Sequence, residues 1–286
     1  MTLSRREVAD LLATHGLRPS RALGQNFVVD PNTVRRIARL AAVGPGDRVV
    51  EIGAGFGSLT LALAETGAHV TAIELDRGLV PVLREIVAGL PVDVIEADAL
   101  RLDWGAVLGP SSGPHAGPGR GAGAWVLVAN LPYNIATPLV ADLLDGVPAI
   151  GRMLVMVQRE VGERLAAGPG DEAFGAVSVK VAYWARAKVV GRVPASVFLP
   201  HPNVESVLVH IERRPTPAVD PEEVDPAALF GLVAAGFGQR RKMLRRSLSG
   251  LVEPADFACA GIEPTARAED LDVEAWGRLA VCRGAR

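Results

Sequence analysis

Apolar residues in the first two-thirds of the chain gather in short runs separated by amphipathic segments. Runs rich in β-branched residues predict strands at 48–52, 69–74, 92–96, 124–129 and 152–157. Apolar residues at helical spacing predict helices at 58–65, 77–87, 137–144 and 160–167. This alternation predicts an α/β fold, with a parallel, doubly wound sheet and helices on both faces. Two more strands are predicted near 177–186 and 204–212, and the lack of a clear helix between them allows an antiparallel arrangement.

The segment before the first strand predicts two helices. Ser4 and Glu7 form a capping-box pattern that starts one helix, and Gly16 should end it. Asp30 followed by Pro31 is typical of an N-cap and a first-turn proline, so a second helix is predicted through about Leu40.

Two stretches rich in turn-forming residues interrupt the pattern. Residues 109–123 predict a flexible surface loop within a domain, with His115 in solvent. The Pro- and acid-rich stretch 215–226 predicts a linker to a helical tail. We therefore expect one domain at 1–214 and a small, all-helical C-terminal domain at 215–286.

Composition narrows the class of protein. Hydrophobic residues make up 49% of the 286 residues, too many for a disordered chain, and no run approaches the ~18 apolar residues of a membrane helix. The first residues lack the apolar core of a signal peptide, so we expect a cytoplasmic protein with no membrane partner. Cys259 and Cys282 lack metal-ligand spacing, so we expect no metal and a buried pair of reduced thiols.

Acidic and glycine residues at three predicted strand ends indicate a nucleotide-like cofactor. The first predicted strand leads through Glu51 into a turn with Gly53 and Gly55, and glycines let a backbone pass close to a ligand. Glu74 ends the next strand, where an acid can grip ribose hydroxyls. NAD and S-adenosylmethionine both fit so far. Glu51 favours a cation-bearing cofactor over a pyrophosphate, and Asp98, at the third strand's end, can accept from an adenine amine.

The fourth strand ends in Asn130-Leu131-Pro132-Tyr133, a turn suited to one chemical problem. The exocyclic amine of adenine is a poor nucleophile because its lone pair is spread into the ring. Two oxygen acceptors, the Asn130 side chain and the Leu131 carbonyl, could draw that lone pair out of conjugation. Pro132 stiffens the turn, and Tyr133 offers a flat face for a base. The carboxyl ends of parallel strands are where ligands bind in such folds.

A basic cluster near the C-terminus suggests contact with phosphate. Arg240, Arg241, Lys242, Arg245 and Arg246 are predicted to lie on one face of a helix. Met243, Leu244, Leu248 and Leu251 would lie on its other face. Beside an adenine site we expect this cluster to bind RNA. With a net charge of −2, the chain as a whole does not indicate a polyanion partner.

These residues together resemble the KsgA/RsmA family of small-subunit rRNA adenine dimethyltransferases, over nearly the whole chain. The segments that carry the resemblance, besides Glu74 and Asp98, are 24–27, 51–57, 130–133, 157–165, 198–206, 237–244 and 261–271. The resemblance implies a Rossmann-like class I methyltransferase domain that uses S-adenosylmethionine. Two departures are Ala136, where the family often has serine before Thr137, and the longer 109–123 loop.

The resemblance also implies roles for individual residues. Those expected to contact the cofactor or frame its pocket are Gln25, Asn26, Val28, Glu51, Gly53, Gly55, Glu74, Asp98, Ala99 and Asn130. Asn130, Leu131, Pro132 and Tyr133 would serve the target base, and Phe198, in a proline-flanked loop, would cover its other face. The implied activity is dimethylation of two adjacent adenosines near the 3′ end of small-subunit rRNA, by a monomer acting on an assembling ribosomal particle.

Three alternatives remain open. A large-subunit rRNA methyltransferase of the macrolide-resistance type shares the core motifs, although the 198–206 and 240–246 segments fit it less well. A non-catalytic assembly or transcription factor with the same fold would not need the intact Asn-Leu-Pro-Tyr turn. A nicotinamide-dependent dehydrogenase shares the glycine turn, and titration with each cofactor would distinguish it.

Overall fold

The computed structural model describes residues 2–109 and 124–284. Most of the predicted 109–123 loop, including His115, lies outside these ranges. The chain forms two compact units, the first of residues 1–162 and 188–213 and the second of residues 163–187 and 214–286. The predicted break after residue 214 lies at one boundary between them. The prediction of one continuous first domain differs from the structure, because residues 163–187 pack with the C-terminal helices.

A seven-stranded sheet organises the first unit, in the order β4-β3-β2-β5-β6-β9-β7. Its strands are β2 (Arg48–Ile52), β3 (His69–Glu74), β4 (Val92–Glu96), β5 (Trp125–Asn130), β6 (Ile150–Gln158), β7 (Ala185–Val193) and β9 (Ser206–Arg213). Strands β2 to β6 pair in parallel, and β9 runs antiparallel to β6. The strand order reverses between β2 and β5, the switch point at which open α/β sheets bind ligands. The predicted doubly wound fold is confirmed.

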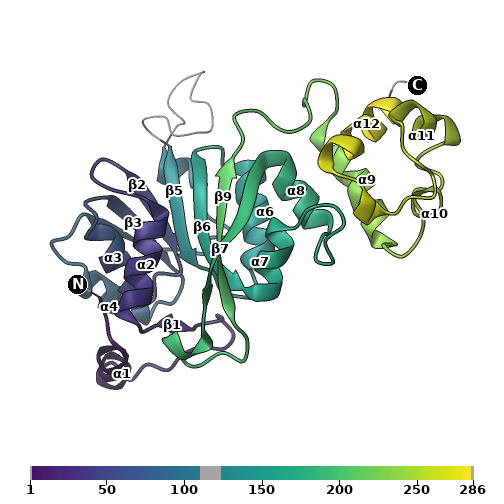
Figure 1. Cartoon of the computed structure of the whole chain (residues 1–286). Coiled ribbons are helices and arrows are strands. Elements are labelled where there is room, and N and C mark those ends of the chain that lie inside the picture. The colour runs from purple at the N-terminus through teal and green to yellow at the C-terminus, as the bar shows by residue number, and fades with distance from the viewer. Residues whose placement is uncertain (1, 110–123, 285–286) are drawn as a thin grey trace. The chain divides into compact units, whose positions relative to one another are not determined.

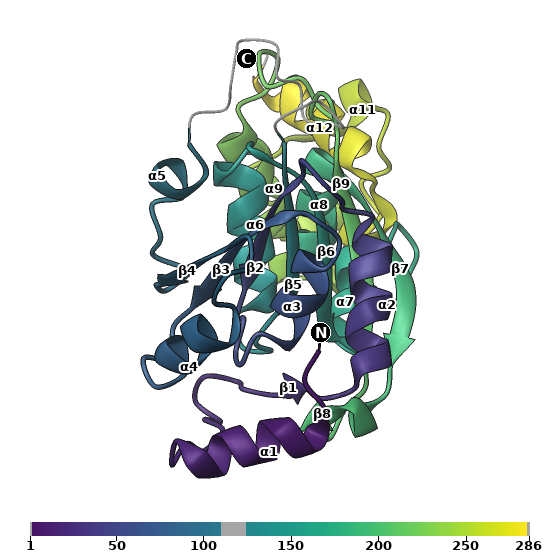
Figure 2. The same ribbon diagram turned by 90° about the vertical axis from the view of Figure 1, so that its left-hand side faces the viewer.

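Helices cover both faces of this sheet (Figures 1 and 2). Apolar side chains of α2 (Pro31–Ala41), α3 (Ser58–Ala64) and α4 (Leu79–Ile86) pack on one face. Helix α6 (Ala136–Gly146) lies on the other face, and the short α5 (Trp104–Leu108) follows β4. The cap predictions are confirmed: Asp30 Oδ2 accepts from Thr33 N at 2.9 Å, and a capping box starts α1 (Arg5–Thr14).

A small second sheet stands at the carboxyl edge of the first. Strand β1 (Phe27–Val28) pairs antiparallel with β8 (Phe198–Leu199), which follows the one-turn 3₁₀ helix η1 (Ala195–Val197). Arg5 reinforces this arrangement, because its Nη2 donates to the carbonyl oxygens of Ser196 and Phe198 at 2.7 and 3.0 Å. The segment 195–199 is thereby held beside the loop that enters α2.

The strand predicted near 177–186 is wrong. Residues Ala176–Trp184 form helix α8, and strand β7 begins only at Ala185. The alternating Val-Ser-Val-Lys-Val pattern is typical of a strand, but long-range contacts favour a helix here. Ser178 starts that helix, because its hydroxyl accepts from Gly175 N at 3.0 Å and donates to the Arg164 carbonyl at 2.6 Å.

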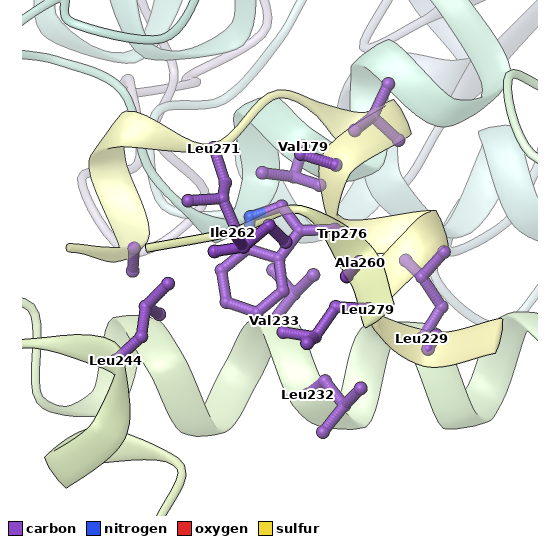
Figure 3. Packing of buried hydrophobic residues seen from close by; sticks show 14 of the residues in the cluster. Val179, Leu229, Leu232, Val233, Leu244, Ala260, Ile262, Leu271, Trp276 and Leu279 are labelled. Carbon is purple, nitrogen blue, oxygen red and sulfur yellow. The ribbon is translucent and has the colours of Figure 1, made fainter. Parts of the chain in front are cut away.

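The second unit is a bundle of short helices. These are α7 (Arg159–Ala166, which begins in the first unit), α8, α9 (Pro226–Gly238), α10 (Leu244–Ser247), α11 (Pro254–Ala260), α12 (Val273–Gly284) and the 3₁₀ helix η2 (Ala268–Asp270). Trp276 is fully buried at its centre, among side chains that include Val233, Ile262 and Leu279 (Figure 3). The unit therefore has its own hydrophobic core.

The cysteines differ from the prediction. Cys259 and Cys282 are joined by a disulfide between α11 and α12, and neither residue is buried. The sequence could not show this, because the two helices are brought together only by packing. Among the described residues, no helix has the length and apolar character needed to cross a membrane.

Candidate active site

A cavity of about 200 Å³ opens at the carboxyl edge of the sheet, in the first unit. Its walls come from the loop before β1, the glycine turn after β2, and the ends of β3, β4 and β5. Every residue predicted to hold the cofactor lines it: Gln25, Asn26, Val28, Glu51, Gly53, Gly55, Glu74, Asp98, Ala99 and Asn130. Parallel pairing brings these separate strand ends together, as the sequence predicted.

The glycine turn makes room for a ligand. Gly53 and Gly55 have φ of 73° and 59°, a region that favours glycine. A Cβ at Gly55 would lie 3.0 Å from the Phe27 ring, and a Cβ at Gly53 would lie 3.6 Å from the Asn130 carbonyl oxygen. Any side chain at these two positions would therefore be strained and would narrow the passage between the turn and its neighbours.

Two buried carboxyl groups face the cavity. Glu51 is 2% exposed, and its Oε2 has no hydrogen-bonding partner among the described residues. Burial raises the pKa of Glu51 to about 8, although the Thr60 hydroxyl opposes the rise, and the charge of Glu74 contributes less. A buried oxygen without a partner is costly, so this site is suited to a ligand that brings a cation or a donor.

Glu74 has a structural task that sequence reasoning did not foresee. Its Oε2 accepts from Gly55 N at 2.7 Å, and its Oε1 accepts from Leu75 N and Asp76 N at 2.9 Å each. Burial raises its pKa, while these backbone bonds oppose the rise. The carboxylate therefore ties the glycine turn to the end of β3, besides facing the cavity.

Gln25 and Asp98 also bond within the chain. Gln25 donates from Nε2 to Asp76 Oδ2 at 2.7 Å and accepts at Oε1 from Ser20 N at 2.7 Å. It thus fastens the loop before β1 to the end of β3. Asp98 Oδ1 accepts from Leu100 N at 3.0 Å, while its Oδ2 lies 3.8 Å from Arg101 Nε. The polar groups that hold Gln25 and Asp98 in the cavity wall are therefore the same groups that would contact a ligand.

The orientation of Asn130 is fixed by a partner 104 residues away. Its Nδ2 lies 2.9 Å from the carbonyl oxygen of Asn26. A carbonyl oxygen only accepts, so the amide nitrogen must be the atom that faces it. The Asn130 Oδ1 atom is then left to accept from another group. The amide is therefore set as an acceptor at the cavity, as its predicted role requires.

The turn after Asn130 is anchored at both ends. Leu131 N donates to the Met156 carbonyl at 3.0 Å, which holds the turn against β6. The Pro132 carbonyl accepts from Ile135 N and Ala136 N at 3.1 Å each and starts α6. Pro132 also lines the cavity. The acceptor at Asn130 is thereby placed on a strand end and a helix start, both rigid elements.

Tyr133 is held by a residue that sequence reasoning missed. Its hydroxyl lies 3.0 Å from the hydroxyl of Ser206, which is fully buried at the start of β9. Half-burial raises the pKa of Tyr133, and the bond to Ser206 opposes the rise. The sequence did single out Ser206, because this residue ends the 198–206 segment that resembles the family. It could not show that Ser206 bonds to Tyr133.

Replacing Ser206 by alanine is expected to lower methyl transfer by about tenfold, since losing one net hydrogen bond of roughly 0.5–1.5 kcal/mol frees the Tyr133 ring. The loss should appear in KM for RNA as much as in kcat, and Ser206→Thr should restore part of it. Steady-state kinetics with cofactor affinity as a control will test this. Equal kinetics for Ser206→Ala and wild type would contradict a positioning role.

Phe198 was predicted to lie exposed in a loop and cover the target base, and the exposure is wrong. Phe198 is fully buried in the cluster that includes Val34, Ile37 and Leu208, and it pairs with Val28 across the β1–β8 ladder. Its ring therefore belongs to the core of the first unit and does not offer an exposed face to a base. The flanking prolines suggested a loop, but pairing with β1 turns the segment inward.

Several lining residues were not predicted: Ala22, Phe27, Leu75, Leu100, Asn134 and Ile135. Leu75 and Leu100 come directly after predicted site residues, and their exposure of 46% and 44% fits a side chain left for a ligand. Their positions, each directly after a residue predicted to contact the cofactor, could have indicated in the sequence that they line the cavity. Among the described residues, no group of three or more potential ligand side chains is arranged to bind a metal.

The basic cluster differs from its predicted form. Helix α9 ends at Gly238 and α10 begins at Leu244, so residues 239–243 form a turn rather than one long helix. Leu244 and Leu248 are buried, whereas Met243 and Leu251 are 41% and 42% exposed. The helix ends at Gly238, just before the cluster, and Met243 forms an isolated β-bridge with Arg267 instead of continuing the helix.

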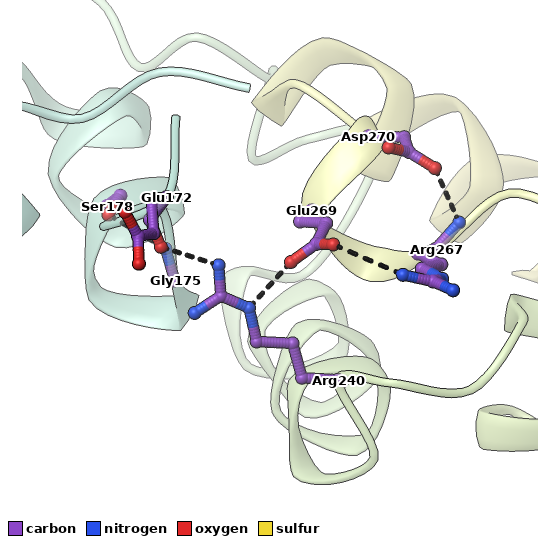
Figure 4. A network of polar contacts seen from close by, with 7 residues as sticks. All are labelled: Glu172, Gly175, Ser178, Arg240, Arg267, Glu269 and Asp270. Atoms are coloured by element: carbon purple, nitrogen blue, oxygen red, sulfur yellow. Dashed lines mark hydrogen bonds and ion pairs between the residues drawn. The ribbon is translucent and has the colours of Figure 1, made fainter. Parts of the chain in front are cut away.

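Arg240 is the exception within that cluster. Its Nε lies 2.6 Å from Glu269 Oε2, and its Nη2 donates to the Glu172 carbonyl at 2.7 Å (Figure 4). Arg240 therefore ties the turn to η2 and to the loop before α8. Arg241, Lys242, Arg245 and Arg246 are exposed.

A doubly wound sheet with an acid-lined cavity at its switch point and an Asn-Leu-Pro-Tyr turn beside it defines a class I methyltransferase that acts on an amine. The family model "Ribosomal RNA adenine dimethylase" matches residues 17–282, and the chain belongs to this family. Methyltransferases of this family use S-adenosylmethionine as the methyl donor.

Similar proteins support this assignment. "Ribosomal RNA small subunit methyltransferase A" of Thermobifida fusca is 45% identical over 96% of this chain and 93% of its own. The protein of the same name from Cutibacterium acnes is 47% identical over 94% of this chain and 89% of its own. The crystal structure of the 23S rRNA methyltransferase ErmE is similar with a TM-score of 0.66 and 25% identity, over 91% of this chain and 100% of that one.

Proposed function

We propose that this protein transfers two methyl groups from S-adenosylmethionine to N6 of each of two adjacent adenosines near the 3′ end of small-subunit rRNA. The observation that carries the proposal is the Asn130 amide, whose nitrogen is committed to the Asn26 carbonyl at 2.9 Å. The acceptor oxygen that an adenine amine needs is therefore set in place at the cavity before any substrate binds. Pre-organised acceptors of this kind cost no reorganisation during the reaction.

The residues of the cavity fit the cofactor. The unpartnered Glu51 Oε2 suits a cationic group, and the left-handed Gly53 and Gly55 leave the space that a side chain would fill. Asp98 and Leu100 also line the cavity. When bound, S-adenosylmethionine supplies an activated methyl group on a sulfonium.

The chain's own residues then position the base. Asn130 Oδ1 and the Leu131 carbonyl would each accept one hydrogen bond from the adenine amine and draw its lone pair out of conjugation with the ring. Tyr133, held by Ser206, would support the base by stacking. Holding both partners in a reactive geometry can supply several kcal/mol of the barrier reduction. After one transfer the methylated amine releases one proton to solvent and keeps one hydrogen, so either acceptor can still orient it for the second.

The small subunit is favoured over the large one as the substrate. The relatives that are 45% and 47% identical carry the name of the small-subunit enzyme, whereas ErmE is 25% identical. We further propose that a monomer acts in the cytoplasm on an assembling ribosomal particle, because the target loop must be open for a base to enter the site.

The direct test is to map dimethyladenosine in rRNA from a strain that lacks this protein and from the same strain complemented with it. The proposal expects both marks in small-subunit rRNA to disappear and return. Purified protein should also transfer methyl groups to small-subunit precursor particles. Marks that persist in the deletion strain, or that are lost only from large-subunit rRNA, would contradict the proposal.

The exposed part of the 240–246 cluster gives a separate prediction. Reversing Arg241 and Arg245 to glutamate should weaken RNA binding about tenfold at 0.1 M salt, and each lost contact should reduce the log–log salt slope by ~0.7–0.9. Cofactor affinity should not change, because these residues lie outside the cavity. RNA affinity over a salt series is the measurement. Parallel lines of equal height for variant and wild type would mean that both arginines face only solvent.

A further inference from the structure

We propose that a second basic surface, on the first unit, binds the RNA phosphate backbone next to the target adenosines. We call it the α2–β7 face, and it comprises Arg35, Arg36, Arg39, Arg152, Lys188 and Arg192. It is separate from the 240–246 cluster, which belongs to the second unit. The inference rests on the proposed function, because it extends the same RNA beyond the base that is methylated.

Helix α2 lies beside strand β7. Arg36 Nη1 donates to the Arg192 carbonyl at 3.0 Å. Its guanidinium lies across Gly191, where a Cβ would come within 2.2 Å of Nη2, so a side chain at this position would make the guanidinium shift. Beneath the charges, Ile37 and Val190 pack in one apolar cluster. Figure 2 shows α2 and β7 side by side in the first unit.

The positive charges on this face are not neutralised. Arg35, Arg39, Lys188 and Arg192 are exposed, and none forms an ion pair within the described parts of the chain. The sequence has no acidic residue between Asp30 and Asp47, or between Glu172 and Glu205. Glu212 lies opposite Arg152 in the β6–β9 register.

Such segregation is informative in a chain of net charge −2. Acidic residues outnumber basic ones overall, so an even mixture of charges would place acids here as well. Like charges repel one another, and a folded surface gains nothing from collecting them. A polyanion that neutralises several of them at once releases its counterions and binds with salt-dependent affinity. Guanidinium groups also bond phosphate in a planar, two-pronged geometry.

The face starts where the active site ends. Helix α2 begins three residues after Val28, and β7 ends five residues before Phe198. Val28 and Phe198 pair in the β1–β8 ladder, and Val28 lines the cavity. A nucleotide strand that delivers its base to Asn130 can therefore continue past this ladder onto α2 and β7. The partner that fits is the phosphate backbone of the RNA flanking the target.

The test compares two double charge reversals of equal size. Arg39→Glu with Lys188→Glu alters the α2–β7 face, at two exposed residues whose side chains form no hydrogen bond or ion pair with the described residues. Arg77→Glu with Arg84→Glu is a control of equal charge change. Both arginines are exposed near β4, at the other end of the strand order, where Arg77 Nε lies 3.0 Å from Glu96 Oε1 and Arg84 Nη2 donates to the Val94 carbonyl at 3.5 Å. Circular dichroism and cofactor affinity will show that both variants fold.

Binding is measured to deproteinised small-subunit rRNA and to the precursor particle over a salt series. The altered face should lower affinity for both by about tenfold at 0.1 M salt, and the log–log salt slope should fall by roughly 1.4–1.8 for two lost contacts. KM for the RNA should rise while kcat stays unchanged. The control should remain within twofold of wild type.

Three outcomes would overturn the inference. Equal loss in both variants would show a general charge effect, and no loss in either would show a solvated surface. Loss with the particle but not with deproteinised RNA would identify a protein partner instead. Failure of the proposed function can be told apart from failure of this inference. In that case wild-type protein would bind RNA without methylating adenine, and the RNA affinities of the two variants would still show whether this face binds RNA.

Discussion

Replacing Asn130 by alanine is expected to lower kcat by about 10²–10³-fold, the usual cost of removing one pre-organised group that stabilises a transition state. The reason is that Asn130 Oδ1 is the side-chain acceptor held at the cavity by the bond from Nδ2 to the Asn26 carbonyl. Single-turnover methyl transfer with saturating RNA and cofactor is the measurement.

Controls separate alignment of the amine from binding. RNA affinity of the Asn130→Ala variant should change less than threefold, because the residue aligns a base and does not anchor the phosphate backbone. Asn32→Ala, an exposed asparagine on the first turn of α2, is a matched substitution with no expected effect on kcat. If turnover of Asn130→Ala stays within about threefold of wild type, a change of only ~0.7 kcal/mol, Asn130 is not the aligning group.

Replacing Glu51 by glutamine is expected to remove a pH dependence of stability. In the folded chain, burial raises the pKa of Glu51 from its ordinary value of about 4.5 to about 8. Between these values the folded state holds a proton that the unfolded chain has lost. The contribution of Glu51 is thus fully present below about 4.5, falls by roughly 1.4 kcal/mol per pH unit, and is lost by about 8.

The neutral glutamine cannot titrate, so thermal unfolding of wild type and Glu51→Gln should agree near pH 5 and diverge toward pH 8. At pH 8 the variant should be more stable by a few kcal/mol, or roughly 5–10 °C in Tm for a domain of this size. Denaturation curves across this range are the measurement. Identical pH slopes for the two proteins would refute a buried, proton-binding Glu51.

Cofactor binding provides the second readout for Glu51. A cationic group beside a carboxyl favours its charged form, so binding near neutral pH should release a proton from wild type and none from Glu51→Gln. Calorimetry in two buffers with different ionisation heats measures this release. The variant should also bind S-adenosylmethionine at least tenfold more weakly, since a charge-assisted contact of roughly 1.5–3 kcal/mol is lost.

The site was predictable from sequence wherever it depends on strand ends. The apolar runs before Glu51, Glu74, Asp98 and Asn130 each predicted a strand, and parallel strands bring their carboxyl ends to one edge of the sheet. All four residues line the cavity. The same reasoning failed for Phe198, whose flanking prolines indicate a loop although pairing with β1 buries the ring.

By itself, the sequence determined what local physics decides: the helix starts at Ser4 and Asp30, the alternation of strands and helices, and the glycine turn. Capping bonds and hydrophobic periodicity act within a few residues, so they can be read in order along the chain.

Only the tertiary structure decided which partners these residues have. The Asn26 carbonyl sets the Asn130 amide across 104 residues, and Ser206 holds Tyr133 across 73. Residues 176–184 form a helix although their local pattern is typical of a strand, and Gly191 lies under Arg36 only because α2 packs beside β7. Each of these depends on contacts between segments apart in the sequence, whose free energy exists only once the sheet or the helical bundle has formed.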